Sequence, residues 1–227
     1  MEKAQIFELI KKEVLTEWRQ RYAINGMLLY LISTIFVCYM SFNLKAGVID
    51  NITWNALFWI IILFTSVNTV AKSFIQESQG RQLYFYSIAS PEAIILSKVI
   101  YNTTLSILLA LLGFVFYGLV MSGGVWNIED MDYTYFLIAI VLGSMGFASC
   151  LTMVSAIASK AQNSTSLMAI LSFPVIIPLI LVVIKLSKNA MDGLDRAAST
   201  DEIITLLAIN VITLAISYIL FPYLWRS

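Results

Sequence analysis

Residues that could carry chemistry are scarce in this chain, and their spacing excludes the common catalytic and metal sites. The 227 residues include no histidine, which is the commonest general base and a usual ligand of zinc and haem. Cys38 and Cys150 lie in apolar runs without a CxxC pair or metal-ligand spacing, which is typical of buried hydrophobic side chains. We therefore expect no catalytic residue, no metal site and no directly bound cofactor.

Nucleotide and lipid chemistry are also disfavoured by the motifs. No glycine-rich loop of the form GxxxxGK[ST] occurs, so the chain does not hydrolyse a nucleotide by that route. The stretch DGLDRA at 192–197 superficially resembles the acidic signature of phospholipid head-group transferases, but the order of its last two residues differs. No second acidic motif follows it. We expect the chain not to be an enzyme.

Charged residues avoid the long apolar runs. All fourteen acidic and fourteen basic residues fall between these runs or at their ends. Transporters driven by protons or ions usually need ionisable groups inside the membrane for coupling. A self-powered transporter is therefore disfavoured, and energy for any transport must come from another protein.

The composition predicts one integral membrane domain over residues 1–227. The chain is 59% hydrophobic and 12% charged, with a mean hydropathy of +0.84, whereas soluble domains are roughly 45–50% apolar. A helix needs about 20 apolar residues to cross the hydrocarbon core, and six intervals are long enough. The predicted fold class is therefore all-α, with transmembrane helices near residues 24–43, 52–71, 99–121, 134–158, 164–184 and 203–224.

Basic residues favour a cytoplasmic location for both termini. With the N-terminus inside, ten of the fourteen lysines and arginines fall in inner segments and four in outer ones, as the positive-inside rule requires. The net charge of zero gives no indication of a nucleic-acid partner, and none is expected.

Residues 1–22 have the pattern of an amphipathic helix on the inner membrane face. Ile6, Ile10, Val14 and Trp18 recur every four residues, and charged side chains occupy most of the remaining surface. An ordinary solvated helix that leads into the first span is the alternative.

The connection at 72–98, the longest on the cytoplasmic side, is expected to be structured. Gly80 interrupts one short helical piece, and Ser90, Pro91 and Glu92 have the pattern of an N-cap followed by proline at the first helical position. This segment is either a docking surface for a soluble partner or an interfacial helix that only anchors the bundle. The residues alone leave both interpretations open.

The fourth span carries a face of small residues. Gly143, Gly146 and Ala148, with Ser144 and Ser149, would let other helices approach closely. We expect this face to serve helix packing, and a substrate-lining role is the alternative.

The outer connections are polar or acidic. Residues 185–202 form a turn-rich segment that ends in Ser199-x-x-Glu202, a capping-box pattern at the start of the last span. Aromatic residues near the outer ends are expected in the interfacial belt, with contact to a planar ligand as the alternative. These aromatics are Trp54, Trp126 and Tyr133.

Two prolines interrupt the fifth span. Pro174 and Pro178 each remove a backbone donor from a membrane helix, and their spacing places both defects on roughly one face. Ser172 could satisfy part of the freed backbone. We expect a kink or partial break, a candidate hinge, with an outer half-helix that is free to tilt.

Three stretches carry a resemblance to a known family. They are EWRQRYAINGMLLY (17–30), FIQESQGRQLYFYSIASPEAIILSKVIYN (74–102) and LMAILSFPVIIPLIL (167–181). With the six spans and the amphipathic N-terminal helix, the whole chain resembles CcmB, a membrane subunit of the haem exporter used in cytochrome c maturation. That family belongs to the ABC-2 type permeases.

The resemblance implies specific coupling residues in the cytoplasmic loop. Family members carry there an acid, a glycine, a leucine-rich piece ending in proline, and a lysine. Many relatives have a small residue, leucine and glutamate directly after the glycine, where this chain has Arg81, Gln82 and Leu83. The positions implied to couple the chain to an ATPase are Glu77, Gly80, Arg81, Leu83, Pro91 and Lys98.

The resemblance also implies partners and a location. A homodimeric permease in the bacterial inner membrane would dock two copies of a CcmA-like ATPase subunit and work beside a haem-handling membrane protein and a periplasmic haem chaperone. ATP would be bound by the partner, and haem would be a substrate ligated by other proteins. Two mechanisms stay open: haem moves across this subunit, or ATP-driven motion releases haem-loaded chaperone. A permease for a lipid, polysaccharide or drug and a non-transport assembly scaffold are the alternatives.

Overall fold

The computed structural model describes residues 2–19, 21–43, 50–75, 89–121, 131–159, 164–194 and 196–226. Six of its helices are long and apolar enough to cross a membrane, and the described residues contain no strand. This confirms the predicted all-α fold class, and the chain is a multi-pass membrane protein. The helices are α1 (Glu2–Arg19), α2 (Arg21–Asn43), α3 (Asn51–Ile75), α5 (Pro91–Val120), α6 (Tyr133–Ala158), α7 (Ser164–Met191), the 3₁₀ helix η2 (Arg196–Ser199) and α8 (Thr200–Arg226).

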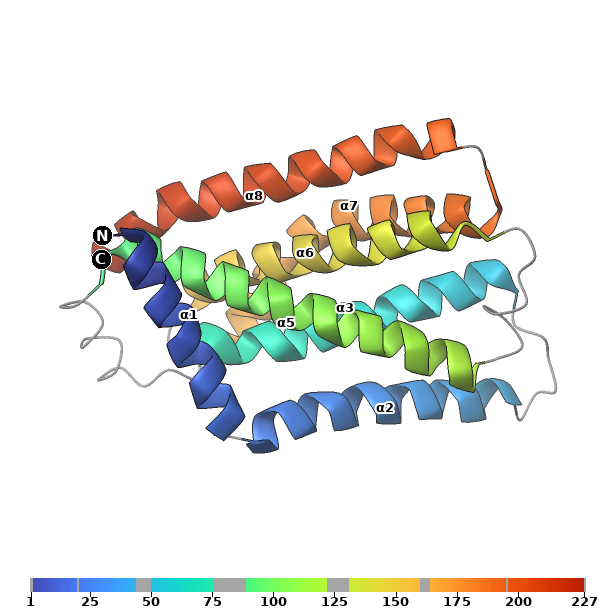
Figure 1. Cartoon of the computed structure of the whole chain (residues 1–227), viewed down its shortest axis with the longest axis horizontal. Helices are drawn as coiled ribbons and strands as arrows, with labels where there is room; N and C mark the ends of the chain where they lie inside the picture. Colours follow the sequence, from blue (N-terminus) through green and yellow to red (C-terminus); the bar gives the residue numbers. More distant parts are fainter. Residues whose placement is uncertain are drawn as a thin grey trace.

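The six long helices run along the long axis of the molecule, and α1 lies obliquely across one end (Figure 1). Both chain termini lie at that end, which we call the terminal end; the opposite end is the far end. The last turn of α3 and the first turn of α5 are also at the terminal end. The N-terminal helix is thus at the same end as the two helix ends that the predicted cytoplasmic loop joins.

Two helices are longer than we expect from the charge-free intervals of the sequence. Helix α5 begins at Pro91 and not near 99, and α7 ends at Met191 and not near 184. Both helices continue past a lysine, because Lys98 and Lys185 each have a carboxylate partner. A charged residue therefore marks the limit of the apolar interval and not the end of the helix.

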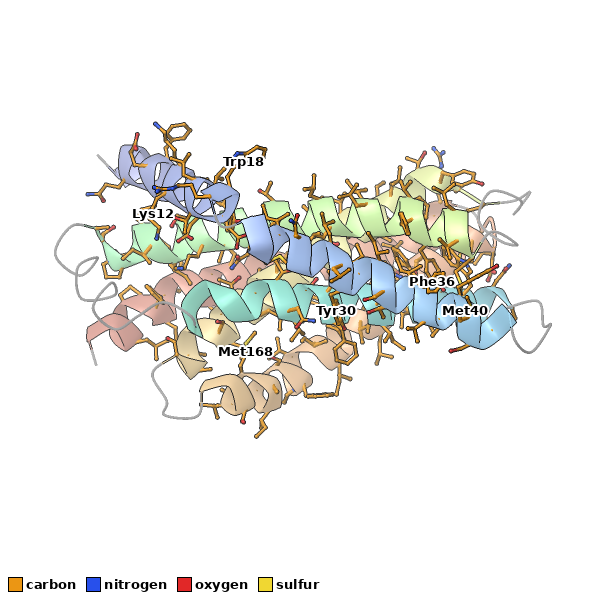
Figure 2. The ribbon with its side chains drawn as sticks, turned by 90° about the horizontal axis from the view of Figure 1, so that it is seen from below. Lys12, Trp18, Tyr30, Phe36, Met40 and Met168 are labelled. Atoms are coloured by element: carbon orange, nitrogen blue, oxygen red, sulfur yellow. The ribbon has the colours of Figure 1, made fainter. Side chains whose placement is uncertain are left out.

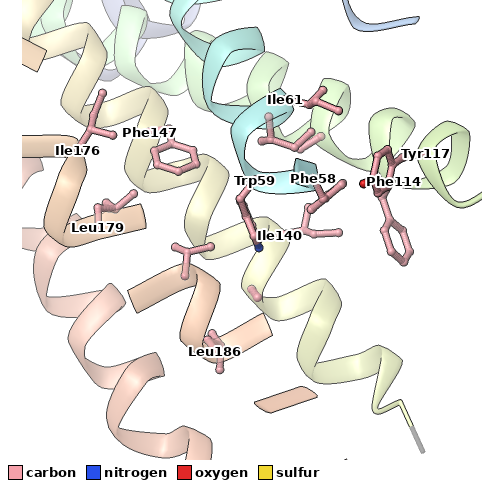
Figure 3. Packing of buried hydrophobic residues seen from close by; sticks show 14 of the residues in the cluster. Phe58, Trp59, Ile61, Phe114, Tyr117, Ile140, Phe147, Ile176, Leu179 and Leu186 are labelled. Carbon is pink, nitrogen blue, oxygen red and sulfur yellow. The ribbon is translucent and has the colours of Figure 1, made fainter. Parts of the chain in front are cut away.

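Helix α6 is the centre of the bundle. In the span it forms, 67% of the most apolar window is buried, compared with 17% for the span in α2. Its small-residue face serves packing, as predicted: a Cβ atom on Gly143 would lie 2.9 Å from the Trp59 ring of α3, and one on Gly146 would overlap Leu179 of α7. Figure 3 shows Trp59, Phe147 and Leu179 gathered in this core.

An aromatic cluster fills the space between α3, α5 and α6. Trp54 stacks on Phe58 with ring centroids 5.9 Å apart, and its ring lies 4.7 Å from that of Tyr117. The Tyr117 hydroxyl donates to the Trp54 carbonyl oxygen at 3.1 Å. The expected interfacial position of Trp54 is therefore wrong, because only 3% of it is exposed.

The other two aromatic residues expected in the interfacial belt are Tyr133 and Trp126. Tyr133 is 38% exposed at the first position of α6, where it can reach the membrane boundary. Trp126 lies outside the described residues.

Replacing Gly143 by valine should destabilise the bundle. The new side chain would meet both Trp59 and Val183 at about 3 Å or less, and overpacking of a close-packed core typically costs about 1–3 kcal/mol. The measurement is the denaturation midpoint of the purified chain in detergent. Gly26→Val is the matched control, because nothing lies within 4 Å of a Cβ atom at Gly26; equal losses in both variants would contradict the packing assignment.

Candidate functional site

The predicted coupling residues are only partly within the structure. Four of them lie outside the described residues: Glu77, Gly80, Arg81 and Leu83. The other two, Pro91 and Lys98, lie at the beginning of α5.

The cap at the start of α5 has the predicted form. Ser90 is extended (φ −69°, ψ 145°), and its hydroxyl oxygen accepts the backbone N–H of Ala93 at 3.3 Å. Pro91 occupies the first helical position. An N–H at this position has no carbonyl partner within the helix, so the missing N–H of proline costs no hydrogen bond. This cap sets the direction in which the preceding connection meets α5.

Lys98 faces α1 and not a free surface. Only 2% of the residue is exposed, and its Nζ atom lies 3.3 Å from Oε1 of Glu13. The same carboxylate oxygen lies 2.9 Å from Nζ of Lys12. Lys98 therefore attaches α1 to α5, and any effect on a soluble partner would pass through the position of α1.

The two lysines determine the charge state of Glu13. Burial raises the pKa of this carboxyl, but the positive charges of Lys98 and Lys12 and their hydrogen bonds outweigh burial and hold it below 4.5. A lowered pKa means that the pair stabilises the fold above about pH 4.5. That contribution is lost as the pH falls through the pKa of the folded state.

Helix α1 has two apolar faces where the sequence predicted one stripe. Leu9 packs on the cluster of Ile94, Ile95, Val99 and Phe221. On the opposite side Phe7, Val14 and Trp18 are 65%, 47% and 70% exposed. Figure 2 shows Lys12 on the side of α1 toward α5 and Trp18 pointing away from the bundle. The ion pair with Lys98 thus fixes which face of α1 is left for the membrane boundary.

A polar cluster that the sequence did not predict joins α3 to α7. Asn55 donates to the Ile184 carbonyl oxygen at 3.0 Å and accepts from the Ser187 hydroxyl at 2.8 Å. The indole N–H of Trp59 donates to the Ser187 oxygen at 2.8 Å. Asn55 and Trp59 are four residues apart, which places them on one face of a helix. This spacing is the only feature of the sequence that links them. Ser187 lies in the segment that the sequence predicts to be a polar, turn-rich connection, so the sequence does not indicate it as the partner of Asn55.

The far end of the bundle is held by ion pairs. The Asp132 carboxylate caps α6 by accepting from the Thr134 and Tyr135 N–H groups, and it lies 3.1 Å from Nε of Arg196. The Asp132 N–H donates to the Ala190 carbonyl oxygen at the end of α7. Ser199 directly precedes α8, as the capping-box pattern predicts, but the Glu202 carboxylate contacts Lys185 at 2.6 Å.

Helix α7 continues through both prolines. Its helical assignment from Ser164 to Met191 has no interruption at Pro174 or Pro178. The Ser172 hydroxyl donates to the Met168 carbonyl oxygen at 2.6 Å, so it does not compensate the carbonyls that the prolines leave without a donor. A hinge at these prolines stays a prediction.

The half of α7 expected to tilt is the one that is tied down. Ser187, Lys185 and the Ala190 carbonyl oxygen all bond to neighbouring elements between the prolines and the far end of the bundle. The expectation of a free outer half-helix is therefore wrong, because the polar residues assigned to a turn-rich segment are instead part of the helix and its contacts.

Within the part of the chain that the structure describes, no group of three or more acidic or cysteine residues could hold a metal ion.

Comparison with known families identifies the family of this chain. The sequence model of the family "CcmB protein" matches residues 4–223. The chain belongs to the CcmB family. As a CcmB protein it is a membrane component of the haem exporter of cytochrome c maturation and belongs to the Ccm system of proteins. It matches none of the curated proteins with which it was compared.

Removing the Ser187 hydroxyl should weaken the α3–α7 contact. Ser187→Ala leaves the Trp59 N–H and the side-chain oxygen of Asn55 without the partner they share. Hydrogen bonds between membrane helices contribute about 0.6–2 kcal/mol. The measurement is the unfolding midpoint in detergent. Ser33→Ala is the control, because the exposed Ser33 hydroxyl bonds only within its own helix; a loss no larger than that of the control would contradict the assignment.

Neutralising Glu13 should release α1 from α5. Glu13→Gln leaves the Lys98 charge buried beside a neutral amide. Breaking a buried ion pair costs about 3–5 kcal/mol. Because the Glu13 side chain is partly exposed, we expect a smaller loss of stability here, about 2 kcal/mol. We expect faster hydrogen exchange in α1, an effect that lowering the pH through the folded-state pKa of Glu13, which lies below 4.5, should reproduce in the wild type. Glu8→Gln on the exposed side of α1 is the control. Adding Lys98→Met to Glu13→Gln should restore part of the protection, and unchanged exchange in Glu13→Gln would exclude the attachment.

Proposed function

We propose that this CcmB protein is the permease subunit of an ATP-driven exporter complex in the bacterial inner membrane, with both termini in the cytoplasm. In this proposal a separate CcmA-like ATPase binds and hydrolyses ATP. Its motion passes through the 72–98 segment to a homodimeric helical bundle.

The observation that carries the proposal is the attachment of α1 to the start of α5. The connection between α3 and α5 ends at the Ser90 cap, and Lys98 then ties that end of α5 to Glu13 of α1. A soluble partner that moves the connection would therefore move α5 and α1 together. This supports a mechanical role for the terminal end of the bundle.

The distribution of charge supports an external source of energy. The charged residues of the membrane helices lie near a helix end, and the buried polar groups deeper in the bundle are neutral. Asn102, for example, donates to Thr152 at 2.9 Å between α5 and α6. Such groups hold helices together but do not carry protons at neutral pH, so coupling to a proton or ion gradient is disfavoured.

Haem and the other Ccm proteins complete the proposal. With no histidine in the sequence, the chain lacks the commonest haem ligand, so haem would be ligated by the haem-handling membrane protein and the periplasmic chaperone. The ATP-driven motion either moves haem or releases haem-loaded chaperone. A scaffold that only holds assembly partners together is the competing function.

Assay of the complex with its ATPase tests the coupling. The variants Glu77→Ala and Gly80→Leu change the connection, and a coupling free energy of 1–3 kcal/mol predicts a fall of about fivefold or more in the ATPase rate of the assembled complex. Lys188→Ala is the control, because Lys188 contacts Asp192 at the far end. Unchanged assembly and ATPase rate in both connection variants would refute the coupling role.

A second measurement separates the permease from the scaffold. An ATPase-dead partner should abolish cytochrome c maturation while the complex still assembles. Maturation that survives the dead ATPase but fails without this chain would establish the scaffold instead.

A further inference from the structure

A groove of about 310 Å³ lies at the terminal end, between the last turns of α8 and the first turn of α5. It is lined by Glu92 of α5 and by Tyr218, Ile219, Pro222 and Tyr223 of α8. Its volume is at the lower limit of small-molecule sites, about 300 Å³. Neither the coupling contact at Lys98 nor the polar cluster of α3 and α7 uses these residues.

Two of the lining residues can supply hydrogen-bond acceptors. The first is Glu92, through its carboxylate. The second is Tyr218: Pro222 lies inside α8 and has no N–H to offer the Tyr218 carbonyl oxygen, which is four residues earlier. Tyr218 and Tyr223 are also lining residues, and aromatic faces attract cations. This set of groups suits a cation that donates hydrogen bonds, such as a primary ammonium.

The groove adjoins the exposed apolar side of α8. The same side of the helix continues toward the membrane interior with Val211, Ile212 and Ile219, which are 65%, 56% and 61% exposed. Phe221, 4% exposed, packs on the other side into the cluster with Ile95, so α8 is fixed to α5 beside the groove. An occupant that has both a headgroup and an acyl chain would fit this surface.

We propose that the groove binds the primary ammonium headgroup of a phospholipid, with an acyl chain along the exposed side of α8. The ammonium donates to the Glu92 carboxylate and to the Tyr218 carbonyl oxygen, and the ring of Tyr223 covers it. A quaternary ammonium has no N–H to donate and binds more weakly. An anionic headgroup is repelled by Glu92. The inference is independent of the proposed transport function.

Native mass spectrometry of the delipidated full-length chain tests this binding. The probes are phosphatidylethanolamine, phosphatidylcholine and phosphatidylglycerol with identical palmitoyl and oleoyl chains. We expect phosphatidylethanolamine to bind at least about threefold more tightly than phosphatidylcholine, because the quaternary headgroup loses both hydrogen bonds and keeps only its charge. Phosphatidylglycerol should bind most weakly.

Two variants separate binding from folding. Glu92→Gln should weaken phosphatidylethanolamine binding about fivefold through loss of the ion pair. Pro222→Ala restores an N–H for the Tyr218 carbonyl oxygen, so it should weaken binding about threefold while it stabilises α8. The matched controls are Glu8→Gln on α1 and Pro174→Ala on α7, which should leave binding unchanged.

Three outcomes would overturn the proposal. The first is equal binding of phosphatidylethanolamine and phosphatidylcholine by the wild type. The second is unchanged binding in both Glu92→Gln and Pro222→Ala. The third is full displacement of the lipid by free ethanolamine at matched concentration, which would assign the groove to a soluble amine and not to a lipid.

Discussion

The indole of Trp59 joins the two kinds of contact on which the bundle depends. Its ring lies against Gly143 of α6, where a side chain would collide with it, and its N–H donates to Ser187 of α7. Lipid tails are as apolar as leucine, so burial of apolar surface gives membrane helices little net attraction for one another. Close packing and hydrogen bonds must hold α3, α6 and α7 together, and Trp59 contributes to both.

Charged and neutral contacts are divided along the membrane normal. Neutral contacts such as Asn102–Thr152 lie within the bundle. Ion pairs lie toward the ends, Glu13–Lys98 at the terminal end and Arg196–Asp132 at the far end. This division follows from the cost of a charge in hydrocarbon. It also leaves the two ends able to respond to pH and to charged partners, while the middle of the bundle is insensitive to both.

The sequence predicted the elements better than their contacts. Six spans followed from apolar intervals, and the family followed from stretches such as FPVIIP, but Lys98 and Lys185 were placed at helix ends because their partners are distant in the chain. The same limitation hid Ser187 as the partner of Asn55. Trp54 was misplaced because an aromatic near a span end suits an interface or a core equally well, and only tertiary packing decides. Of the coupling residues, only Pro91 and Lys98 are described, and Lys98 has a role in tying α1 to α5 that spacing could not predict.

The contacts of α7 also determine which part of the helix could move. Between the prolines and the far end, the helix is fixed by Ser187, by Lys185 paired with Glu202, and by its last carbonyls. Toward the terminal end it presents Ile170 and Phe173, which are 68% and 66% exposed. If Pro174 and Pro178 act as a hinge, the fixed half is therefore the far one, and the moving half is the one nearer α1. Flexing at the prolines would then occur on the same side of the membrane as the connection to α5, where a soluble partner could drive it.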